Sequence, residues 1–397
     1  MTRPRYPRRR AELMRVAFVI GEFPKPSETF ILRQIVGLLD RGCDLEIFAR
    51  RPVEARVVDD VVVQRELLAR THYRREGPSP RSSPVAALRS LFGARSGTRS
   101  FDVVHAHFGP YGLYALEERE AGALCGPLVT SFHGHDVHRV PRQRGRGVYA
   151  PLFAAGQRFT ANTRFTADAI VRLGCPPDRL ELLPMGIVLP PVPVLPRPVA
   201  SPRRILTIAR HVEKKGLEYG IRAIAALARR HPGLVYDLAG DGPLRGRLER
   251  LAAELGITGR VRFLGWCSQA RAQSLLRAAD VFVLPSVTAK DGDMEGQALV
   301  LQEAQALGVP VVSTLHNGIP EGLVPGDTGL LVPERDSAAL ADAIDRILRD
   351  DELRARMGER AVAFVRGRYD IEVLNDRLLQ LYRDLGDRTV PPDRRSR

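Results

Sequence analysis

Seven prolines crowd residues 184–202 and separate two stretches of chain that share one pattern. In each stretch, short apolar runs alternate with segments of helical periodicity. The apolar runs before the prolines are 16–20, 45–48, 102–104, 127–131, 158–161 and 179–183, and those after them are 204–210, 234–239, 260–264, 280–284 and 309–313. This alternation is typical of βαβ units, so the sequence predicts two α/β domains with parallel sheets.

The domain boundaries follow from the prolines, because proline fits poorly in helices and sheets and stiffens a linker. We expect a first domain over residues 1–185, a linker over 186–203 and a second domain over 204–370. A helix with an apolar stripe should follow over 371–387. A chain of 397 residues is also longer than one core usually supports. The arginine- and proline-rich ends, residues 1–10 and 388–397, are predicted to be disordered.

The four cysteines stand alone, without the CxxC spacing of a zinc site. Isolated cysteines suit a reducing cytoplasm, which is the predicted location. The apolar stretch after Arg15 is short and lacks a small-residue cleavage site, so we do not interpret it as a signal peptide. No run approaches the roughly 18 apolar residues that a membrane span needs.

Charge is unevenly distributed between the two halves. The net charge is +14, of which +11 falls in residues 1–200, with arginine-rich stretches at 70–99 and 139–146. Such asymmetry suits an anionic membrane surface or a lipid-diphosphate acceptor, and plain solubility remains the simpler alternative. Nucleic acid is not an expected partner, because aromatic residues make up 6% of the chain and no known binding module is recognisable.

Two acids in the stretch 291–313 indicate a ligand. Glu303 has apolar neighbours three and four residues away, which predicts a buried carboxylate that needs hydrogen-bond donors. Sugar hydroxyls could supply those donors. Glu295 precedes the helix, whose first-turn amides would bind phosphate oxygens. We expect these amides at Gly296, Gln297, Ala298 and Leu299. The alternative is a structural helix with a locally paired glutamate.

A basic turn follows the apolar run 204–210. Arg210 ends this run, and Lys215 lies five residues later, just before a predicted helix. Strand-to-helix turns of this kind line the ligand crevice of α/β sheets. Only four lysines occur in the chain, and two are adjacent here, which favours contact with a diphosphate. A solvated turn with a chance lysine pair is the alternative.

These residues together resemble family 4 retaining glycosyltransferases of the GT-B fold. The resemblance rests on Arg210 with Lys215-Gly216, and on Glu295 with Glu303 as an E-x7-E pair. Three further segments share it, namely Gly240-Asp241-Gly242-Pro243, Val261 to Gly265 and Pro285-Ser286. Upstream segments around Phe23–Phe30, His105–Gly109 and Phe132–Asp136 resemble the subgroup that builds bacterial exopolysaccharides such as colanic acid.

The resemblance implies two Rossmann-like domains that face each other across a cleft, with the C-terminal helix crossing back to the first. It implies a nucleotide-sugar donor, with UDP favoured by family frequency, and a glycan or polyprenyl-diphosphate-linked acceptor. Hexose transfer would retain configuration and need no cofactor or metal. Asp291-Gly292-Asp293 has the DxD spacing of a metal-binding pair, but the resemblance implies no metal there.

The resemblance also assigns expected roles to residues. Catalytic roles would fall to Arg210, Lys215, Glu295 and His133. Donor binding would involve Glu303, Gly242 and Gly265 in addition to the amides named above. Weaker acceptor-side candidates are Gly21, Glu28 and His107. In this scheme Arg210 and Lys215 stabilise the leaving diphosphate, Glu295 contacts the hexose and Glu303 contacts the ribose.

Other functions remain open at this stage. A GT-B epimerase acting on UDP-N-acetylhexosamine would bind a similar donor without an acceptor. A phosphorylase would need pyridoxal phosphate on a lysine. A secondary metabolite could be the acceptor, and a noncatalytic basic membrane adaptor would not depend on Glu295.

Overall fold

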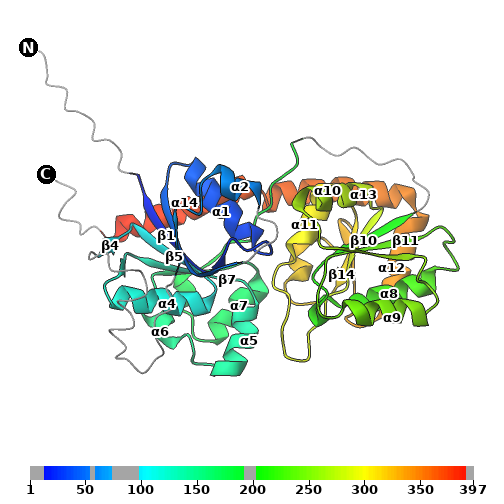
Figure 1. Ribbon diagram of the computed structural model, residues 1–397, viewed down its shortest axis with the longest axis horizontal. Helices are drawn as coiled ribbons and strands as arrows, with labels where there is room; N and C mark the ends of the chain where they lie inside the picture. The colour runs from blue at the N-terminus through cyan, green and yellow to red at the C-terminus, as the bar shows by residue number, and fades with distance from the viewer. Residues whose placement is uncertain (1–12, 54–58, 74–97, 192–202, 390–397) are drawn as a thin grey trace, which may run out of the picture. The chain divides into compact units, whose positions relative to one another are not determined.

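The computed structural model describes residues 13–53, 59–73, 98–191 and 203–389, which form two compact units (Figure 1). The first unit comprises Met1–Ser131, Pro151–Phe159 and Asn375–Arg397, and the second comprises Phe132–Ala150 and Thr160–Leu374. Of the residues expected to be disordered, Arg388 and Thr389 are helical, because the C-terminal helix runs to Thr389. Residues 1–10 and 390–397, also expected to be disordered, lie outside the described residues, as do most of the linker and of the arginine-rich stretch 70–99. The domain boundaries therefore stay a prediction.

Two parallel sheets form where the apolar runs occur. The seven-stranded sheet has the order β3 (Thr71–Tyr73), β2 (Asp44–Pro52), β1 (Arg15–Phe23), β5 (Val103–His107), β7 (Leu128–Phe132), β8 (Arg158–Ala161) and β9 (Leu180–Leu182). The six-stranded sheet has the order β12 (Val261–Gly265), β11 (Val235–Ala239), β10 (Arg204–Ile208), β13 (Val281–Leu284), β14 (Val311–Thr314) and β15 (Gly329–Val332). A small third sheet joins β4 (Arg99–Ser100) and β6 (Leu124–Cys125).

Strand pairing is parallel in both large sheets. In the first, β1 pairs in parallel with both β2 and β5. In the second, every pair of neighbouring strands is parallel. The predicted fold class, α/β with two parallel sheets, is confirmed.

Helices connect the strands. In the first half of the chain they are α1 (Thr29–Asp40), α2 (Asp60–Gln64), α4 (Gly109–Glu120), α5 (His135–Arg144), α6 (Ala150–Ala155) and α7 (Arg164–Arg172). In the second half they are α8 (Leu217–Leu227), α9 (Arg245–Glu254), α10 (Gln269–Ala278), α11 (Leu299–Ala306), α12 (Ser337–Arg349), α13 (Asp351–Arg368) and α14 (Ile371–Thr389). Short 3-10 helices occupy Pro177–Arg179, Glu213–Lys215 and Ile319–Gly322.

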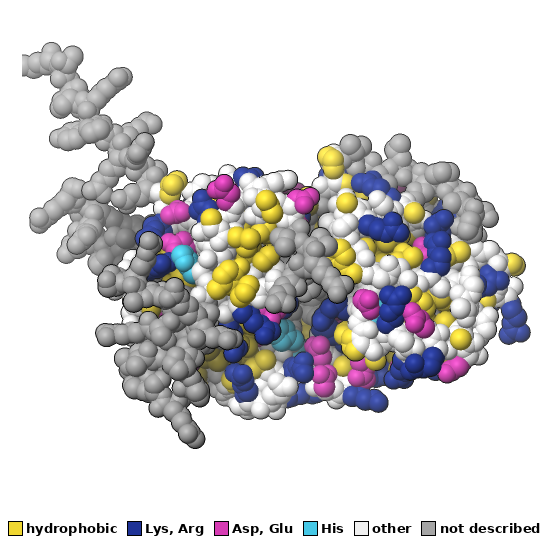
Figure 2. All heavy atoms as spheres, in the orientation of Figure 1, with side chains coloured by type: hydrophobic (Ala, Val, Ile, Leu, Met, Phe, Trp, Pro, Cys, Tyr) yellow, Lys and Arg dark blue, Asp and Glu magenta, His cyan; other side chains and the backbone are white. Residues whose placement is uncertain are grey.

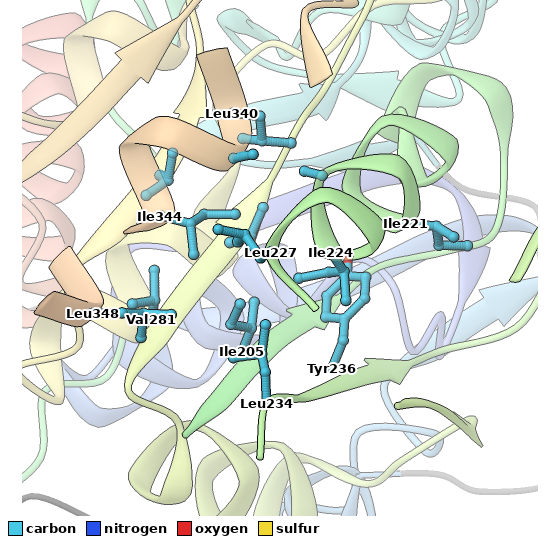
Figure 3. Packing of buried hydrophobic residues seen from close by; sticks show 14 of the residues in the cluster. Ile205, Ile221, Ile224, Leu227, Leu234, Tyr236, Val281, Leu340, Ile344 and Leu348 are labelled. Atoms are coloured by element: carbon cyan, nitrogen blue, oxygen red, sulfur yellow. The ribbon is translucent and has the colours of Figure 1, made fainter. Parts of the chain in front are cut away.

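The six-stranded sheet is covered on both faces, which explains its continuous apolar runs. Successive residues of a strand point to opposite faces, so Ile205 packs in the cluster with α8 and α12, and Leu206 packs with α10 and α11. Figure 3 shows the first cluster, where Ile205, Leu227 and Ile344 approach one another from β10, α8 and α12. This packing fixes the strand ends from which the candidate site is built.

The C-terminal helix α14 is attached to the first unit by polar contacts from residue 375 onward. Its Tyr382 hydroxyl lies 2.5 Å from His105 Nδ1, and His105 Nε2 lies 2.7 Å from Ser131 Oγ. Arg41 donates to Asp376 at 2.7 Å. The His105 and Tyr382 side chains are both fully buried, so their hydrogen bond holds α14 in the core of this unit.

Candidate functional site

Loops at the carboxyl ends of four strands of the second sheet meet at one edge. They follow β10, β13, β14 and β15, which are neighbours in the sheet. Because all four strands are parallel, their carboxyl ends lie on the same side, where α/β proteins bind ligands. The polar residues Lys215, Glu295, His316 and Glu334 come from these four loops.

A glycine shapes the basic turn after β10. Gly216 has φ +59°, and a Cβ there would lie 1.9 Å from the carbonyl oxygen of Pro285. Only glycine fits such a left-handed position against neighbouring backbone. Gly216 thus ends the 3-10 helix Glu213–Lys215 and begins α8, which keeps both lysines beside the loop after β13.

The lysine pair of this turn is not solvated. Lys214 is buried, and its Nζ lies 3.2 Å from Asp293 Oδ1 and 3.2 Å from the Met294 carbonyl oxygen. The alternative of a solvated lysine pair is therefore wrong. Lys214 anchors the segment that precedes Glu295.

Lys215 and Glu295 form the central ion pair of the site. Lys215 Nζ donates to Glu295 Oε2, and Lys214 Nζ lies 3.9 Å from Oε1. The side chains of Lys215 and Glu295 are 13% and 12% exposed. Burial raises the pKa of Glu295, but the attraction of Lys215 and Lys214 outweighs it and lowers this pKa to about 2.

Arg210 adds an exposed positive charge at the end of β10. Within the part of the chain that the structure describes, its guanidinium has no hydrogen bond or ion pair. Burial lowers the pKa of Lys215, Glu295 opposes this effect, and the charges of Lys214 and Arg210 reinforce it. Arg210 is therefore near Lys215, and the two cations could bind the same anionic ligand.

His133 lies on the loop after β7 and is half-buried. Asp136 shapes this loop, because its Oδ1 accepts hydrogen bonds from the amides of His133 at 3.1 Å and Gly134 at 2.8 Å. Burial lowers the pKa of His133 to about 4, against an opposing effect of Asp136. The imidazole is therefore neutral at physiological pH.

The backbone of the His133 loop touches the backbone at Gly296, within the second unit. A Cβ on Gly296 would lie 2.3 Å from the His133 carbonyl oxygen, and a Cβ on Gly134 would lie 3.2 Å from the Gly296 nitrogen. Asn162 Nδ2 also donates to the His133 carbonyl at 3.2 Å. The structure thus brings three predicted site residues, His133, Glu295 and Gly296, into one place.

The helix after Glu295 begins later than expected. α11 starts at Leu299 with Ala298 at its N-cap, so Gly296 and Gln297 are not first-turn residues. Gln297 is held out of the helix because its side chain accepts from the Met185 amide and donates to the Met185 carbonyl, both at 2.8 Å. The prediction that the amides of Gly296 and Gln297 belong to the helix is wrong.

Glu303 is half-buried, not buried as predicted. The reason is that Leu299 and Val300, which share its helix face, are also only half-buried. Gln269 Nε2 donates to Glu303 Oε1 at 3.4 Å. A half-buried carboxylate in this position can be reached by a ligand.

The predicted glycines lie on the strands beyond β10. Gly242 follows β11, and a Cβ there would lie 2.6 Å from the His211 carbonyl oxygen. Gly265 ends β12 with φ +69°, and its carbonyl accepts from the Gly240 amide at 2.7 Å. Gly242 therefore allows close backbone packing at the edge that carries Arg210, whereas Gly265 adopts a left-handed conformation that favours glycine.

The acceptor-side candidates all belong to the first unit. Gly21 lies inside β1, and a Cβ there would lie 2.0 Å from the Tyr111 hydroxyl oxygen. The interpretation that Gly21 leaves room for a substrate is therefore wrong, because Tyr111 fills the space. Glu28 is the N-cap of α1 and pairs with Lys25 at 2.9 Å. His107 is fully buried with its ring stacked on Phe18 at 5.2 Å. The roles of Glu28 and His107 stay predictions.

Sequence reasoning missed His316 and Glu334. His316 Nε2 lies 3.1 Å from the Glu295 amide nitrogen, and its Nδ1 lies 2.5 Å from Glu334 Oε1. Their positions along the chain could have identified them, because each lies just after a strand. His316 comes two residues after β14 and Glu334 two residues after β15, just as Arg210 comes two residues after β10.

Comparisons with known proteins agree with this arrangement. Residues 197–364 match the family "Glycosyl transferases group 1", and residues 27–189 match "Glycosyltransferase Family 4". In overall structure the chain is similar to Anabaena Alr3699/HepE in complex with UDP-glucose, with a TM-score of 0.74 and 19% identity over 94% of this chain and 100% of that one. The fold is therefore that of a GT-B glycosyltransferase, as predicted.

Sequence relatives define the family more closely. The chain is 33% identical to the glycosyltransferase WcaL of Escherichia coli (strain K12), assigned to colanic acid biosynthesis, over 94% of this chain and 100% of that protein. It is 32% identical to the amylovoran biosynthesis glycosyltransferase AmsK of Erwinia amylovora, over 84% and 90%. The chain belongs to glycosyltransferase family 4, and the predicted family is confirmed.

Two further features bear on partners. Among the described residues, no helix combines the length and the hydropathy that crossing a membrane requires. In the same residues, no group of three or more His, Cys, Asp or Glu side chains could hold a metal ion. The predicted metal independence stays a prediction, because it concerns the reaction.

Proposed function

We propose that this glycosyltransferase moves a hexose from a UDP-sugar to a glycan or polyprenyl-diphosphate-linked acceptor during cell-surface polysaccharide biosynthesis, with retention of configuration. The observation that carries the proposal is the largely buried Lys215–Glu295 pair beside the exposed Arg210 at one sheet edge. Two cations and one carboxylate suit a ligand that combines a diphosphate with sugar hydroxyls.

The chemistry of the proposed step requires charge stabilisation on the leaving diphosphate. Arg210 and Lys215 would supply it, since cations already placed by the fold stabilise developing negative charge without reorganising. Glu295 would bind hydroxyls of the donor hexose, and Glu303 would bind those of the ribose. The acceptor would attack from the face that the diphosphate leaves, and a diphosphate oxygen would take its proton. This route explains retention without a protein nucleophile and without a metal ion.

His133 would lie beside the reacting centre. Its loop contacts Gly296, the residue that follows Glu295. A neutral imidazole offers one N–H donor and one acceptor, so it could bind a hydroxyl of the hexose or of the acceptor.

Relatives support the choice of donor and pathway. HepE was solved in complex with UDP and with UDP-glucose, and WcaL and AmsK carry names from exopolysaccharide biosynthesis. We infer a cytoplasmic enzyme on these grounds.

An anionic membrane surface is a further proposed partner, supported by the excess of positive charge in residues 1–200. Several arginines of that half have local partners. Arg139 lies 3.5 Å from Asp291, and Arg70 lies 3.4 Å from Asp44. On the face that Figure 2 shows, Lys and Arg side chains are interspersed with Asp and Glu side chains. Cosedimentation of the full chain with phosphatidylglycerol vesicles should be salt-sensitive, and equal sedimentation with neutral vesicles would contradict this partner.

The experiment for the donor is a screen of the purified full chain against UDP-, GDP- and ADP-sugars. We expect a UDP-sugar to raise the melting temperature and to release UDP when a glycan or lipid-linked acceptor is added. Lys215→Ala should abolish both effects. Lys290 is exposed, so the control variant Lys290→Ala should retain them. Identical behaviour of Lys215→Ala and wild type would refute the proposal, and accumulation of a free UDP-sugar isomer would favour an epimerase.

A further inference from the structure

The side chains of Glu334 and His316 are hydrogen-bonded to each other, and the His316 ring contacts the backbone amide of Glu295. His316 follows β14 and is fully buried. Its Nδ1 lies 2.5 Å from Glu334 Oε1, and its Nε2 lies 3.1 Å from the amide nitrogen of Glu295. Glu334 Oε2 also accepts from the Thr288 amide at 2.9 Å, so Glu334 connects the loops after β13, β14 and β15.

These hydrogen bonds fix the tautomer of His316. The Glu295 amide is a donor, so Nε2 must present its lone pair. The ring proton therefore resides on Nδ1 and is donated to Glu334. The pKa of Glu334 is raised by burial but lowered on balance by hydrogen bonds from His316 and Thr288, which keeps Glu334 an acceptor. Its Oε1 and Oε2 are both used as acceptors.

The loop after β14 also donates a hydrogen bond to the backbone carbonyl of Glu295. Asn317, with φ +47°, directs its Nδ2 to within 3.4 Å of the Glu295 carbonyl oxygen and 3.0 Å of His316 Nε2. Both backbone polar groups of Glu295 are thus held by adjacent residues. The side chain that pairs with Lys215 extends from a peptide fixed in this way.

We propose that Glu334 and His316 are positioning residues, which hold the Glu295 backbone by keeping His316 in the Nδ1–H tautomer. The inference rests on the proposed function, because it is the donor-binding role of Glu295 that makes its placement matter. Displacement of a substrate-contacting group by about 1 Å can reduce a rate about a hundredfold. In this proposal both residues act through Glu295.

The test is Glu334→Gln, which replaces one of the two acceptor oxygens by an NH2 donor. If that NH2 faces His316, it donates to Nδ1 and moves the ring proton to Nε2, so Nε2 can no longer accept from Glu295. If the NH2 faces Thr288 instead, it points at the Thr288 amide, and neither of these two N–H donors has an acceptor. We expect the 15N spectrum of histidine-labelled protein to show His316 as Nδ1–H in wild type, and as Nε2–H in the Glu334→Gln molecules whose NH2 faces His316. The His316 signal is identified by its loss in His316→Phe.

Activity should follow the tautomer. We expect kcat/KM of Glu334→Gln to fall by about tenfold to a hundredfold. Asp345→Asn is a matched control, because Asp345 Oδ1 lies 2.7 Å from His231 Nε2 at a histidine–carboxylate pair remote from the site. This control should lose stability but keep its kcat/KM. An Nε2–H tautomer of His316 in wild type, or an equal loss of kcat/KM in Asp345→Asn, would overturn the proposal.

A single variant could lose activity through a general loss of structure. A double-mutant cycle separates that loss from the coupling between Glu334 and His316. Once His316→Phe has removed the acceptor for the Glu295 amide, adding Glu334→Gln should lower kcat/KM by less than about twofold further. Additive losses would show that Glu334 acts independently of His316. The spectra need no substrate, so failure of the positioning role is distinguishable from failure of the proposed donor, which would appear as inactive wild type with the Nδ1–H tautomer intact.

Discussion

Replacing Glu295 by glutamine should destabilise the protein in a pH-dependent way. The change keeps the size of the side chain but removes the charge that faces Lys215 and Lys214. A pKa lowered from 4.5 to about 2 corresponds to about 3 kcal/mol of stabilisation, since each tenfold change in acidity equals about 1.4 kcal/mol. This agrees with the roughly 3–5 kcal/mol lost when one partner of a buried ion pair is removed.

The sign of the pH dependence follows from the direction of the shift. A carboxyl group whose pKa is lower in the folded state contributes its stability above the unfolded pKa of 4.5 and loses it as the pH falls through about 2. The difference between wild type and Glu295→Gln should therefore be about 3 kcal/mol at pH 7 and about 1 kcal/mol at pH 3.

Urea unfolding of the full chain at both pH values measures this difference. Trp266 is the only tryptophan of the sequence and belongs to the same unit as Glu295, so its fluorescence reports on that unit. Glu303→Gln is a matched control, because Glu303 is half-buried and should change stability by less than about 1 kcal/mol. A difference below about 1 kcal/mol at pH 7, or one that does not shrink at pH 3, would refute the reasoning.

Three further predictions concern the loops around this pair. The His133 imidazole should not titrate between pH 5.5 and 8 in NMR spectra, because burial lowers its pKa to about 4; a titration near 6.5 would be the contrary result. Gly216→Ala should lower the free energy of unfolding by more than about 2 kcal/mol because a Cβ has no room, whereas Gly256→Ala, with positive φ but open space, should lose only about 1 kcal/mol; equal losses would argue against the close approach. Gly296→Ala should lower kcat/KM at least about tenfold by pushing the His133 loop away; unchanged kinetics would show that this contact is unimportant.

Much of the fold is predictable from the sequence because most strands of the two large sheets are buried on both faces and therefore appear as continuous apolar runs. The run 204–210 corresponds to β10, and 309–313 corresponds to β14. The strands that escaped prediction lack this signal. β3 is half-buried at a sheet edge, and β15 begins with Gly329, which leaves an apolar run of only three residues, Leu330–Val332.

The candidate site was predictable where charged residues lie on loops next to predicted helices, at the sheet edge where α/β proteins bind ligands. Lys215 and Glu295 are such residues, and the structure pairs them. Glu303 shows the limit, because two of the apolar neighbours that suggested burial, Leu299 and Val300, are themselves half-buried, although Ala306 and Leu307 are buried. His316 and Glu334 lie 18 residues apart on separate loops. Their pairing depends on the order of strands β14 and β15 in the sheet, which spacing along the chain does not contain.

Titration calorimetry with UDP and UMP tests the central claim, that Arg210 and Lys215 bind a diphosphate. Wild type should bind UDP at least about tenfold more tightly than UMP, because charge-assisted hydrogen bonds contribute about 1.5–3 kcal/mol each. In the Arg210→Ala/Lys215→Ala double variant this preference should disappear. Equal affinities in wild type, or an undiminished preference in the double variant, would contradict the account.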